Sequence, residues 1–186
     1  MTKHAALPPV EPIGFHAWPV PAIDSLLWLA WSARGLTHAL WTAADAERPS
    51  AIAASARALE PPAPYVEAIA RYFAGERVDL ENLPLDLSGS AFQKRVWAAL
   101  CGIPYGQVRS YAGIARDIGN PRATRAVGMA NGRNPIAVIV PCHRVVEKNS
   151  QLGGYSSGLA RKRFLLALEG VDVSGEHVRP GQLQLL

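Results

Sequence analysis

Cysteine is scarce in this sequence: its 186 residues include only Cys101 and Cys142. Two cysteines cannot build the set of disulfides that holds a small secreted domain together, nor a zinc site with four thiolate ligands. The N-terminus also lacks the basic, then apolar, then cleavable segments of a secretory signal. We therefore expect a protein of the reducing cytoplasm.

Long apolar runs are absent too, since none approaches the roughly 18 to 20 residues that a membrane-spanning helix needs. With 49% hydrophobic and 18% charged residues, the chain is too apolar for intrinsic disorder. Its excess of positive charge is small, because 19 Lys and Arg against 15 Asp and Glu give a net charge of +4. Composition thus predicts a soluble globular protein without a membrane partner, and permits nucleic-acid binding without requiring it.

The first half of the chain predicts a small sheet and helices. Apolar residues at 23–31 and 36–41, separated by a turn at Gly35, predict a β-hairpin. The alanine-rich residues 43–60 predict a surface helix that ends at a cluster of prolines. A second helix is indicated by the spacing of Tyr65, Ile69, Tyr72 and Phe73. Residues 76–89 have no clear periodicity, and we expect domains at 1–88 and 89–186.

The second half begins with helical signals. Ser90 is a good N-cap for a helix with Phe92, Val96, Trp97 and Leu100 on one face, and Ser110 for a helix over residues 111–118. Gly119 ends that helix, and Asn120 followed by Pro121 predicts the start of the next. Two short helices joined by a tight turn with glycine are typical of a helix-turn-helix, although any helical hairpin can look similar. The second of these helices carries Arg122 and Arg125, and Arg133 follows its end.

Cys142 stands out from Cys101 by its neighbours. The apolar, β-branched residues 136–140 predict a buried strand or extended segment that leads into Cys142 and His143. A thiol beside a base is the arrangement of an activated nucleophile, whereas a lone buried cysteine is usually inert. Cys101 follows Leu100 with no adjacent histidine, so we interpret it as core. A glycine-rich stretch at 153–158 and a last amphipathic helix from about residue 159 complete the chain.

The second half resembles a known family in detail. The segment Pro141-Cys142-His143-Arg144, with Asn134-Pro135 before it and Gly154-Tyr155-Ser156 after it, is similar to the active-site signature of the O6-alkylguanine-DNA alkyltransferases, also called methylated-DNA–protein-cysteine methyltransferases. The likeness extends to Phe92-Gln93, Val96-Trp97, Ile103-Pro104-Tyr105-Gly106, Ser110-Tyr111, Gly119-Asn120-Pro121, Arg125-Ala126-Val127-Gly128 and residues 166–170. The first half resembles the family only loosely.

The resemblance implies that Cys142 takes the alkyl group of O6-alkylguanine in DNA by in-line attack, irreversibly and once per molecule, with O4-alkylthymine left open as a second substrate. His143 would be the base, acting through a water, and Glu169 would orient it as a triad carboxylate does. Tyr111 would donate a proton to the guanine ring edge and crowd the target phosphate. Asn134 would fix the turn that holds the active-site segment.

The resemblance also implies how DNA is held. The backbone of Val145 and Ser156 would read the base edge, with Tyr155 as a pocket wall. The target nucleotide would be rotated out of the duplex, and Arg125 would fill the space it leaves. Small residues of the same helix, Ala126, Gly128 and Ala130, would let it approach the minor groove without sequence preference. We expect double-stranded DNA with alkylated guanine as the partner, a monomeric protein, and Arg133 as a further DNA contact.

The implied fold is α/β in the broad, α+β sense: a small sheet-plus-helix domain followed by a helical, winged-helix-like domain with a helix-turn-helix. Ser157 departs from the glycine that is more common in the family, which would stiffen the pocket loop. Some relatives hold a zinc ion through N-terminal Cys and His, but this chain has only His4, His16 and His38 there. We therefore expect no metal and no other cofactor.

Three other classes of protein fit parts of the pattern. A non-catalytic damage-recognition module would lack the cysteine, which Cys142 argues against. A winged-helix transcriptional regulator with a merely buried Cys142 would bind a defined sequence and would not react with alkylated DNA. A cysteine hydrolase would need an oxyanion site, of which the sequence shows no sign.

Overall fold

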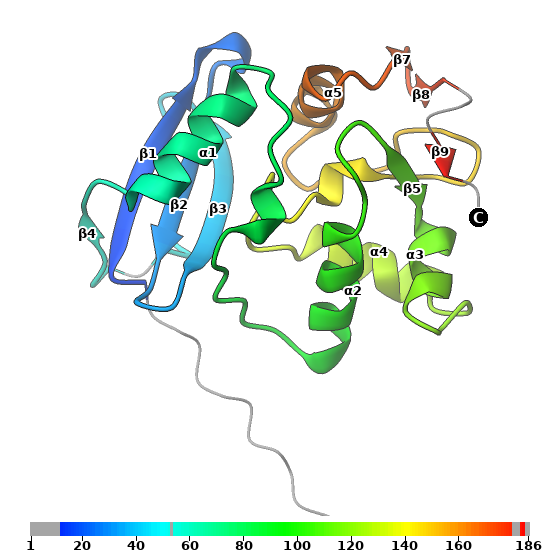
Figure 1. Ribbon diagram of the computed structural model, residues 1–186, viewed down its shortest axis with the longest axis horizontal. Coiled ribbons are helices and arrows are strands. Elements are labelled where there is room, and N and C mark those ends of the chain that lie inside the picture. Colours follow the sequence, from blue (N-terminus) through cyan, green and yellow to red (C-terminus); the bar gives the residue numbers. More distant parts are fainter. Residues whose placement is uncertain (1–11, 53, 180–182, 185–186) are drawn as a thin grey trace, which may run out of the picture.

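The computed structural model describes residues 12–52, 54–179 and 183–184, so His4 lies outside the described residues. Figure 1 shows a sheet with a helix across one face, beside a group of further helices. The elements are, in chain order, β1 (Gly14–Val20), η1 (Pro21–Ile23), β2 (Ser25–Trp31), β3 (Leu36–Ala43), β4 (Arg57–Ala58), α1 (Ala63–Phe73), η2 (Leu80–Asn82), α2 (Ala91–Cys101), β5 (Val108–Ser110), α3 (Tyr111–Asp117), α4 (Thr124–Gly132), η3 (Cys142–Arg144), β6 (Val145–Val146), α5 (Leu159–Leu168), β7 (Val173–Ser174), β8 (His177–Val178) and β9 (Leu183–Gln184). The expected α+β class is confirmed.

The N-terminal half is a four-stranded sheet covered by α1. Its strand order is β3-β2-β1-β4, with antiparallel pairing between β2 and β3, so the predicted hairpin is confirmed. Side chains of β2 alternate between two faces. Leu27 and Leu29 join the main core together with Ile69 of α1, which lies across this face in Figure 1. Trp28 packs on the opposite face.

The predicted surface helix over residues 43–60 is wrong. This segment is a series of turns followed by the short strand β4, which pairs in parallel with β1 at Gly14 and Phe15. Its apolar side chains Ile52 and Ala56 are buried against Trp28. Covering this apolar face of the sheet outweighs the modest intrinsic preference of alanine for helix.

The helix-turn-helix consists of α3 and α4. The turn between them ends α3 with a Schellman motif, in which Gly119 N–H donates to the Arg116 carbonyl (2.9 Å) and Asn120 N–H to the Ala115 carbonyl (2.9 Å). Gly119 has a φ of 72°, a conformation that favours glycine. Since Asn120 and Pro121 complete this turn, α4 begins only at Thr124 with Ala123 as N-cap, and the predicted start at Asn120 was wrong.

Residues 136–140 are buried as predicted, but they form no strand. They make a tight turn in which Val138 has a φ of 72° and Val140 N–H donates to the Ile136 carbonyl (3.0 Å). Ile136 instead bridges to Ala39 on the edge strand β3, where Ala39 N–H donates to Pro135 and Ala137 N–H donates back to Ala39, both at 2.9 Å. The segment that leads to Cys142 therefore docks on the N-terminal sheet.

One core runs through both halves. The main cluster of buried apolar side chains includes Leu29 and Tyr72 from the first half and Trp97, Ile114 and Val140 from the second. In the described part of the chain, no helix has the length and apolar character to cross a bilayer.

Candidate active site

Cys142 is the first residue of η3 and is almost fully buried, with 4% of its surface exposed. Its backbone is held on both sides, because its N–H donates to the Val140 carbonyl (2.8 Å) and its carbonyl accepts from Asn131 Nδ2 (3.4 Å). Asn134 fixes the turn before it: Nδ2 donates to the Val140 carbonyl at 2.8 Å, and Oδ1 accepts from Ile136 N–H at 3.0 Å. These contacts fit the role expected of Asn134, which stays a prediction.

The Cys142 thiol needs help to ionise. Burial raises the pKa of Cys142, and this effect outweighs the opposing ones of Asn134, Tyr155 and the positive charge of Lys162. The thiol is therefore neutral at pH 7. Because a thiolate is the effective nucleophile, a base close to Cys142 is required.

His143 is suited to be that base. It is completely buried, and its Nε2 lies 2.8 Å from Oε1 of Glu169. An ionised carboxylate only accepts hydrogen bonds, so Nε2 carries the proton and Nδ1 keeps a free electron pair. Nδ1 is buried and has no hydrogen-bond partner among the described residues. Burial lowers the pKa of His143 in spite of the opposing charge of Glu169, so the ring is neutral at pH 7.

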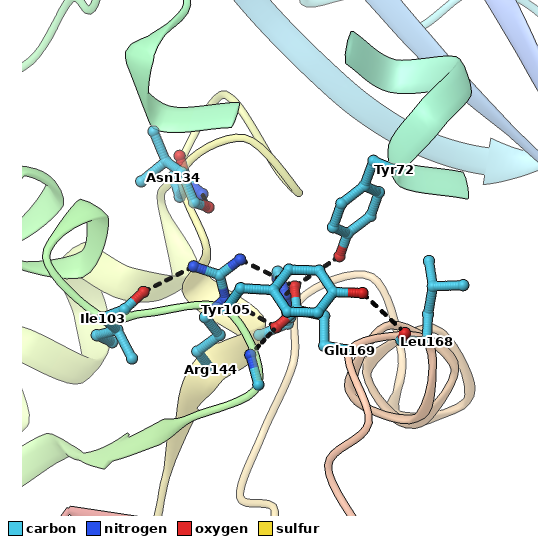
Figure 2. Close-up of polar contacts among 10 residues, drawn as sticks. Tyr72, Ile103, Tyr105, Asn134, Arg144, Leu168 and Glu169 are labelled. Carbon is cyan, nitrogen blue, oxygen red and sulfur yellow. Dashed lines mark hydrogen bonds and ion pairs between the residues drawn. The ribbon is translucent and has the colours of Figure 1, made fainter. Parts of the chain in front are cut away.

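Glu169 lies one residue beyond α5, as its C-cap, and collects donors from several elements (Figure 2). Arg144 donates from Nε to Oε2 at 2.8 Å and from Nη2 to Oε1 at 3.0 Å, while Tyr72 donates from its hydroxyl to Oε1 at 2.7 Å. Burial alone would raise the pKa of Glu169, but His143 and Arg144 hold it well below its ordinary value. Glu169 thus stays ionised.

A cavity of about 350 Å³ lies beside the helix-turn-helix. It is lined by Tyr111, Gly128, Asn131, Gly132, Gly154, Tyr155 and Ser156. The Tyr111 hydroxyl contacts the Gly154 carbonyl at 3.5 Å, and burial raises the pKa of Tyr111 to about 12. Tyr111 therefore keeps its proton at neutral pH and can donate it. The structure thus brings Tyr111, Tyr155, Ser156 and Gly128 together around one space.

The outer surface of α4 carries Arg125, Ala126 and Met129, with Arg133 directly after the helix, and all four side chains are exposed. Gly128 faces Tyr111, since a Cβ atom there would lie 3.9 Å from the ring. Ala130 does not belong to this surface: it is 3% exposed, and its carbonyl accepts from Trp97 Nε1 at 2.9 Å. The expectation that Ala130 is open to a DNA backbone is therefore wrong.

Lys162 is a residue of the site that sequence reasoning missed. It is completely buried, and Nζ donates to the Val145 carbonyl at 2.6 Å and also to the Leu152 carbonyl. Its ammonium thereby ties β6 to the loop that precedes the cavity wall. Burial lowers the pKa of Lys162 to about 8. In the sequence, Lys162 between Arg161 and Arg163 looks like one more solvated charge.

Tyr72 and Arg144 were also missed as partners of Glu169. Arg144 belongs to the motif around Cys142 and His143, which was a signal in the sequence, but its burial to 1% exposure and its contact with Glu169 appear only in the structure. Tyr72 lies in the first half of the chain, 97 residues from Glu169. No local pattern connects the two.

In the described ranges, no three His, Cys, Asp or Glu side chains come together as a metal site. The constellation consists instead of a buried thiol, a neutral imidazole and an ionised carboxylate next to a helix-turn-helix. Together they define a helix-turn-helix protein with a candidate nucleophilic cysteine.

Comparisons with known proteins identify the family. The model of the family described as "6-O-methylguanine DNA methyltransferase, DNA binding domain" matches residues 91–171. The model described as "6-O-methylguanine DNA methyltransferase, ribonuclease-like domain" matches residues 26–87. The crystal structure of the O6-methylguanine methyltransferase from Mycobacterium tuberculosis is 42% identical, with a TM-score of 0.70 over 84% of this chain and 92% of that one. The chain belongs to the 6-O-methylguanine DNA methyltransferase family, which confirms the resemblance seen in the sequence.

Other similar proteins carry names of the same family. A methylated-DNA–protein-cysteine methyltransferase of Mycolicibacterium paratuberculosis is 59% identical over 104 residues, 56% of this chain and 62% of that protein. One of Methanosarcina acetivorans is 60% identical over 99 residues, 53% of this chain and 63% of that protein. The chain thus spans just under two thirds of the length of these curated relatives. A structure of M. tuberculosis OGT in complex with DNA has a TM-score of 0.69 and 40% identity, over 84% of this chain and 92% of that one.

Proposed function

We propose that this protein repairs DNA by transferring the alkyl group of O6-alkylguanine to the sulfur of Cys142, irreversibly and once per molecule. The observation that carries the proposal is that buried Cys142 is followed directly by buried His143, whose Nε2 lies 2.8 Å from Glu169 Oε1, next to a cavity bounded by the helix-turn-helix. Family membership and the named activity of the relatives support it.

The proposed reaction consists of a proton transfer from Cys142 and an alkyl transfer to it. The thiol proton of Cys142 passes to Nδ1 of His143, directly or through one water, and Glu169 stabilises the imidazolium that forms. The Cys142 sulfur attacks the alkyl carbon, an S–C bond forms, and the bond from that carbon to O6 breaks. The electron pair stays with the guanine, the hydroxyl of Tyr111 supplies a proton to its ring edge, and the proton held by His143 returns through solvent to Tyr111. No group in this scheme reverses the thioether, so one molecule repairs one lesion.

In this proposal the exposed side of α4 enters the minor groove of double-stranded DNA. Arg125 occupies the space of the extruded nucleotide, Ala126 and Gly128 allow close approach, and Arg133 contacts phosphate. Tyr155 and the backbone of Ser156 and Val145 receive the base, with the Val145 carbonyl shared with Lys162. Extrusion costs a few kcal/mol, which contacts of this kind have to offset. We further propose that the protein acts as a monomer in the cytoplasm.

Mass spectrometry tests the activity. The protein is incubated with a duplex oligonucleotide that carries one O6-methylguanine, then digested and weighed. We expect a gain of one methyl group on the peptide with Cys142, with at most one group per protein molecule. Cys142→Ala should gain nothing, and Cys101→Ala should behave like wild type. Unmodified, correctly folded wild-type protein would contradict the proposal, and preference for one DNA sequence without any reaction would favour a transcriptional regulator.

A further inference from the structure

Tyr72 is the described residue of the first half of the chain that makes a side-chain hydrogen bond to the proposed acid–base groups. It lies near the end of α1, is completely buried, and donates its hydroxyl proton to Oε1 of Glu169 at 2.7 Å. Oε1 is also the atom that accepts from His143 Nε2 at 2.8 Å. Figure 2 shows the Tyr72 hydroxyl pointing at the carboxylate from the side of the N-terminal sheet. The two donors thus share one oxygen atom, which also accepts from Arg144 Nη2 at 3.0 Å.

We propose that Tyr72 is a positioning residue: its hydroxyl fixes the Glu169 carboxylate and sets the basicity of His143, so that the N-terminal half forms part of the alkyl-transfer site. This inference rests on the proposed function, because it concerns the same acid–base pair. It assigns to the first half a role beyond packing, which the sequence alone left open.

The ring of Tyr72 already has a packing role that needs no hydroxyl. It makes edge contacts with Phe73 (5.4 Å between centroids) and Tyr105 (6.2 Å), and phenylalanine would fill the same space. The hydroxyl is therefore the informative group. Two nearby tyrosines show the ordinary alternative, since Tyr65 donates to the Pro84 carbonyl at 2.8 Å and Tyr105 to the Leu168 carbonyl at 2.9 Å. Only the Tyr72 hydroxyl is bound to the carboxylate.

The charges around His143 decide the direction of the effect. Glu169 favours the imidazolium form, whereas Arg144 and Lys162 disfavour it. Tyr105 and Glu81 lie further out, around Glu169 and Arg144, and Cys142 is adjacent in the chain.

A hydroxyl proton on Oε1 withdraws part of the negative charge that would otherwise stabilise the imidazolium. Removing that hydroxyl strengthens the hold of Glu169 on a protonated His143, so the pKa of His143 rises. More of the base is then already protonated at a given acidic pH, and transfer slows there.

The test compares Tyr72→Phe with wild type, and uses Tyr65→Phe as the matched control because it removes the same atom from the same helix. Single-turnover rates with the O6-methylguanine duplex are measured from pH 5 to 9. For Tyr72→Phe we expect the acidic limb to move up by about 0.5 to 1 pH unit, so that the rate on the sloping part of that limb falls by about 3- to 10-fold. Tyr65→Phe should leave the limb in place.

A second readout does not depend on transfer. The ring of His143 is titrated by NMR, with its signal assigned by its loss in His143→Gln, and its pKa should rise in Tyr72→Phe. If folded Tyr72→Phe has an unchanged pH–rate profile and an unchanged His143 titration, the inference is overturned. A loss of stability without a shift of the acidic limb of the pH–rate profile would also overturn it. If wild type itself fails to react, the proposed function fails, and the NMR titration still decides the role of Tyr72.

Discussion

At the scale of single residues, the protonation states of Cys142 and His143 determine how a transfer reaction could begin. The pKa of Cys142 is raised and that of His143 is lowered, both chiefly by burial. A neutral thiol is thus followed in the chain by a neutral imidazole, and in the proposed reaction the charges appear only during the transfer. In the proposed reaction Glu169, already ionised, stabilises the new imidazolium.

This pairing predicts a specific dependence on pH. Because the pKa of His143 lies below its ordinary value of 6.5, the base stays available through neutral pH. We expect the transfer rate to be level through neutral pH and to fall only at more acidic pH, as the imidazole is protonated. The measurement is the single-turnover rate across that range, with His143→Gln for comparison.

The His143→Gln variant distinguishes a reaction that uses His143 as the base from one that uses only thiolate already present. Without the imidazole, only pre-formed thiolate reacts, so the rate of His143→Gln should be low at pH 7 and increase steadily toward pH 9. A wild-type rate that increases tenfold per pH unit up to pH 9 would show that the base plays no part.

Lys162 gives a prediction about stability. Lys162→Met fills similar space but leaves the carbonyls of Val145 and Leu152 without their buried donor. An unsatisfied buried polar group costs about 1–3 kcal/mol, so we expect the free energy of unfolding to fall by roughly 2–4 kcal/mol. Urea denaturation measures this, and Lys148→Met, which changes an exposed lysine, should stay within about 0.5 kcal/mol of wild type.

The sign of the pH effect follows from the lowered pKa of Lys162, about 8 in the folded chain against an ordinary 10.5. Between these values the unfolded chain binds more protons, so this group stabilises the fold more as the pH increases. The stability difference between wild type and Lys162→Met should therefore grow from pH 8 to pH 10. A constant difference would contradict the assignment.

At the scale of elements, motifs formed by residues close in sequence predicted secondary structure well where no contact with a distant part of the chain overrode them. Ser90 caps α2 with a complete capping box, in which its hydroxyl accepts from Gln93 N–H and Gln93 accepts from Ser90 N–H. Such a motif is decided by neighbours in sequence. The segment 43–60 failed because Ile52 and Ala56 are buried on a sheet face that no local pattern reveals.

Strand β1 was not predicted, and it contains Pro19. Proline cannot donate to a ladder, so it argues against a central strand. Here β4 pairs with β1 only at Gly14 and Phe15, which leaves the side of β1 at Pro19 without a neighbouring strand. A proline is tolerated in a strand where no partner needs its N–H, so the pairing seen in the structure is compatible with Pro19 in β1.

Helix α4 is the element whose role can be separated from the chemistry. Arg125→Ala should slow repair of a duplex by about 10-fold or more, because the extruded state loses the side chain that fills the stack. Reaction with free O6-benzylguanine, which needs no extrusion, should change by less than about 2-fold. The two rates are measured side by side.

Arg57→Ala on β4 is the matched control, because it removes the same charge from an exposed position outside the helix-turn-helix. It should affect neither rate. Equal losses of Arg125→Ala on duplex and free base would place Arg125 in the chemistry or the fold rather than in base extrusion.

At the scale of the whole molecule, the candidate site depends on contacts between distant parts of the chain. The Cys-His pair, Glu169 and Tyr111 could be predicted, because the resemblance covers the half that holds them. Tyr72 could not, because it meets Glu169 only when the sheet and the helices pack together. The contact of Ala39 with residues 135–137 is of the same kind.

This shared packing predicts how the molecule unfolds. The main core contains residues of both halves, and the turn before Cys142 is hydrogen-bonded to β3. Separating the halves would expose that core, so we expect one cooperative transition. Four of the five tryptophans, Trp18, Trp28, Trp31 and Trp41, lie in the first half. In the described part of the chain, α2, α3, α4 and α5 lie in the second half.

Tryptophan fluorescence therefore reports chiefly on the N-terminal sheet, and far-UV circular dichroism chiefly on the C-terminal helices. Urea transitions followed by the two signals should superimpose, with the same midpoint and the same slope. Trp97→Phe, which removes the tryptophan of the second half, sharpens the separation of the probes. If the fluorescence midpoint then differs from the helical one, the halves unfold independently. In that case the contact from Tyr72 to Glu169 can open without global unfolding, and the N-terminal half would hold the acid–base pair only part of the time.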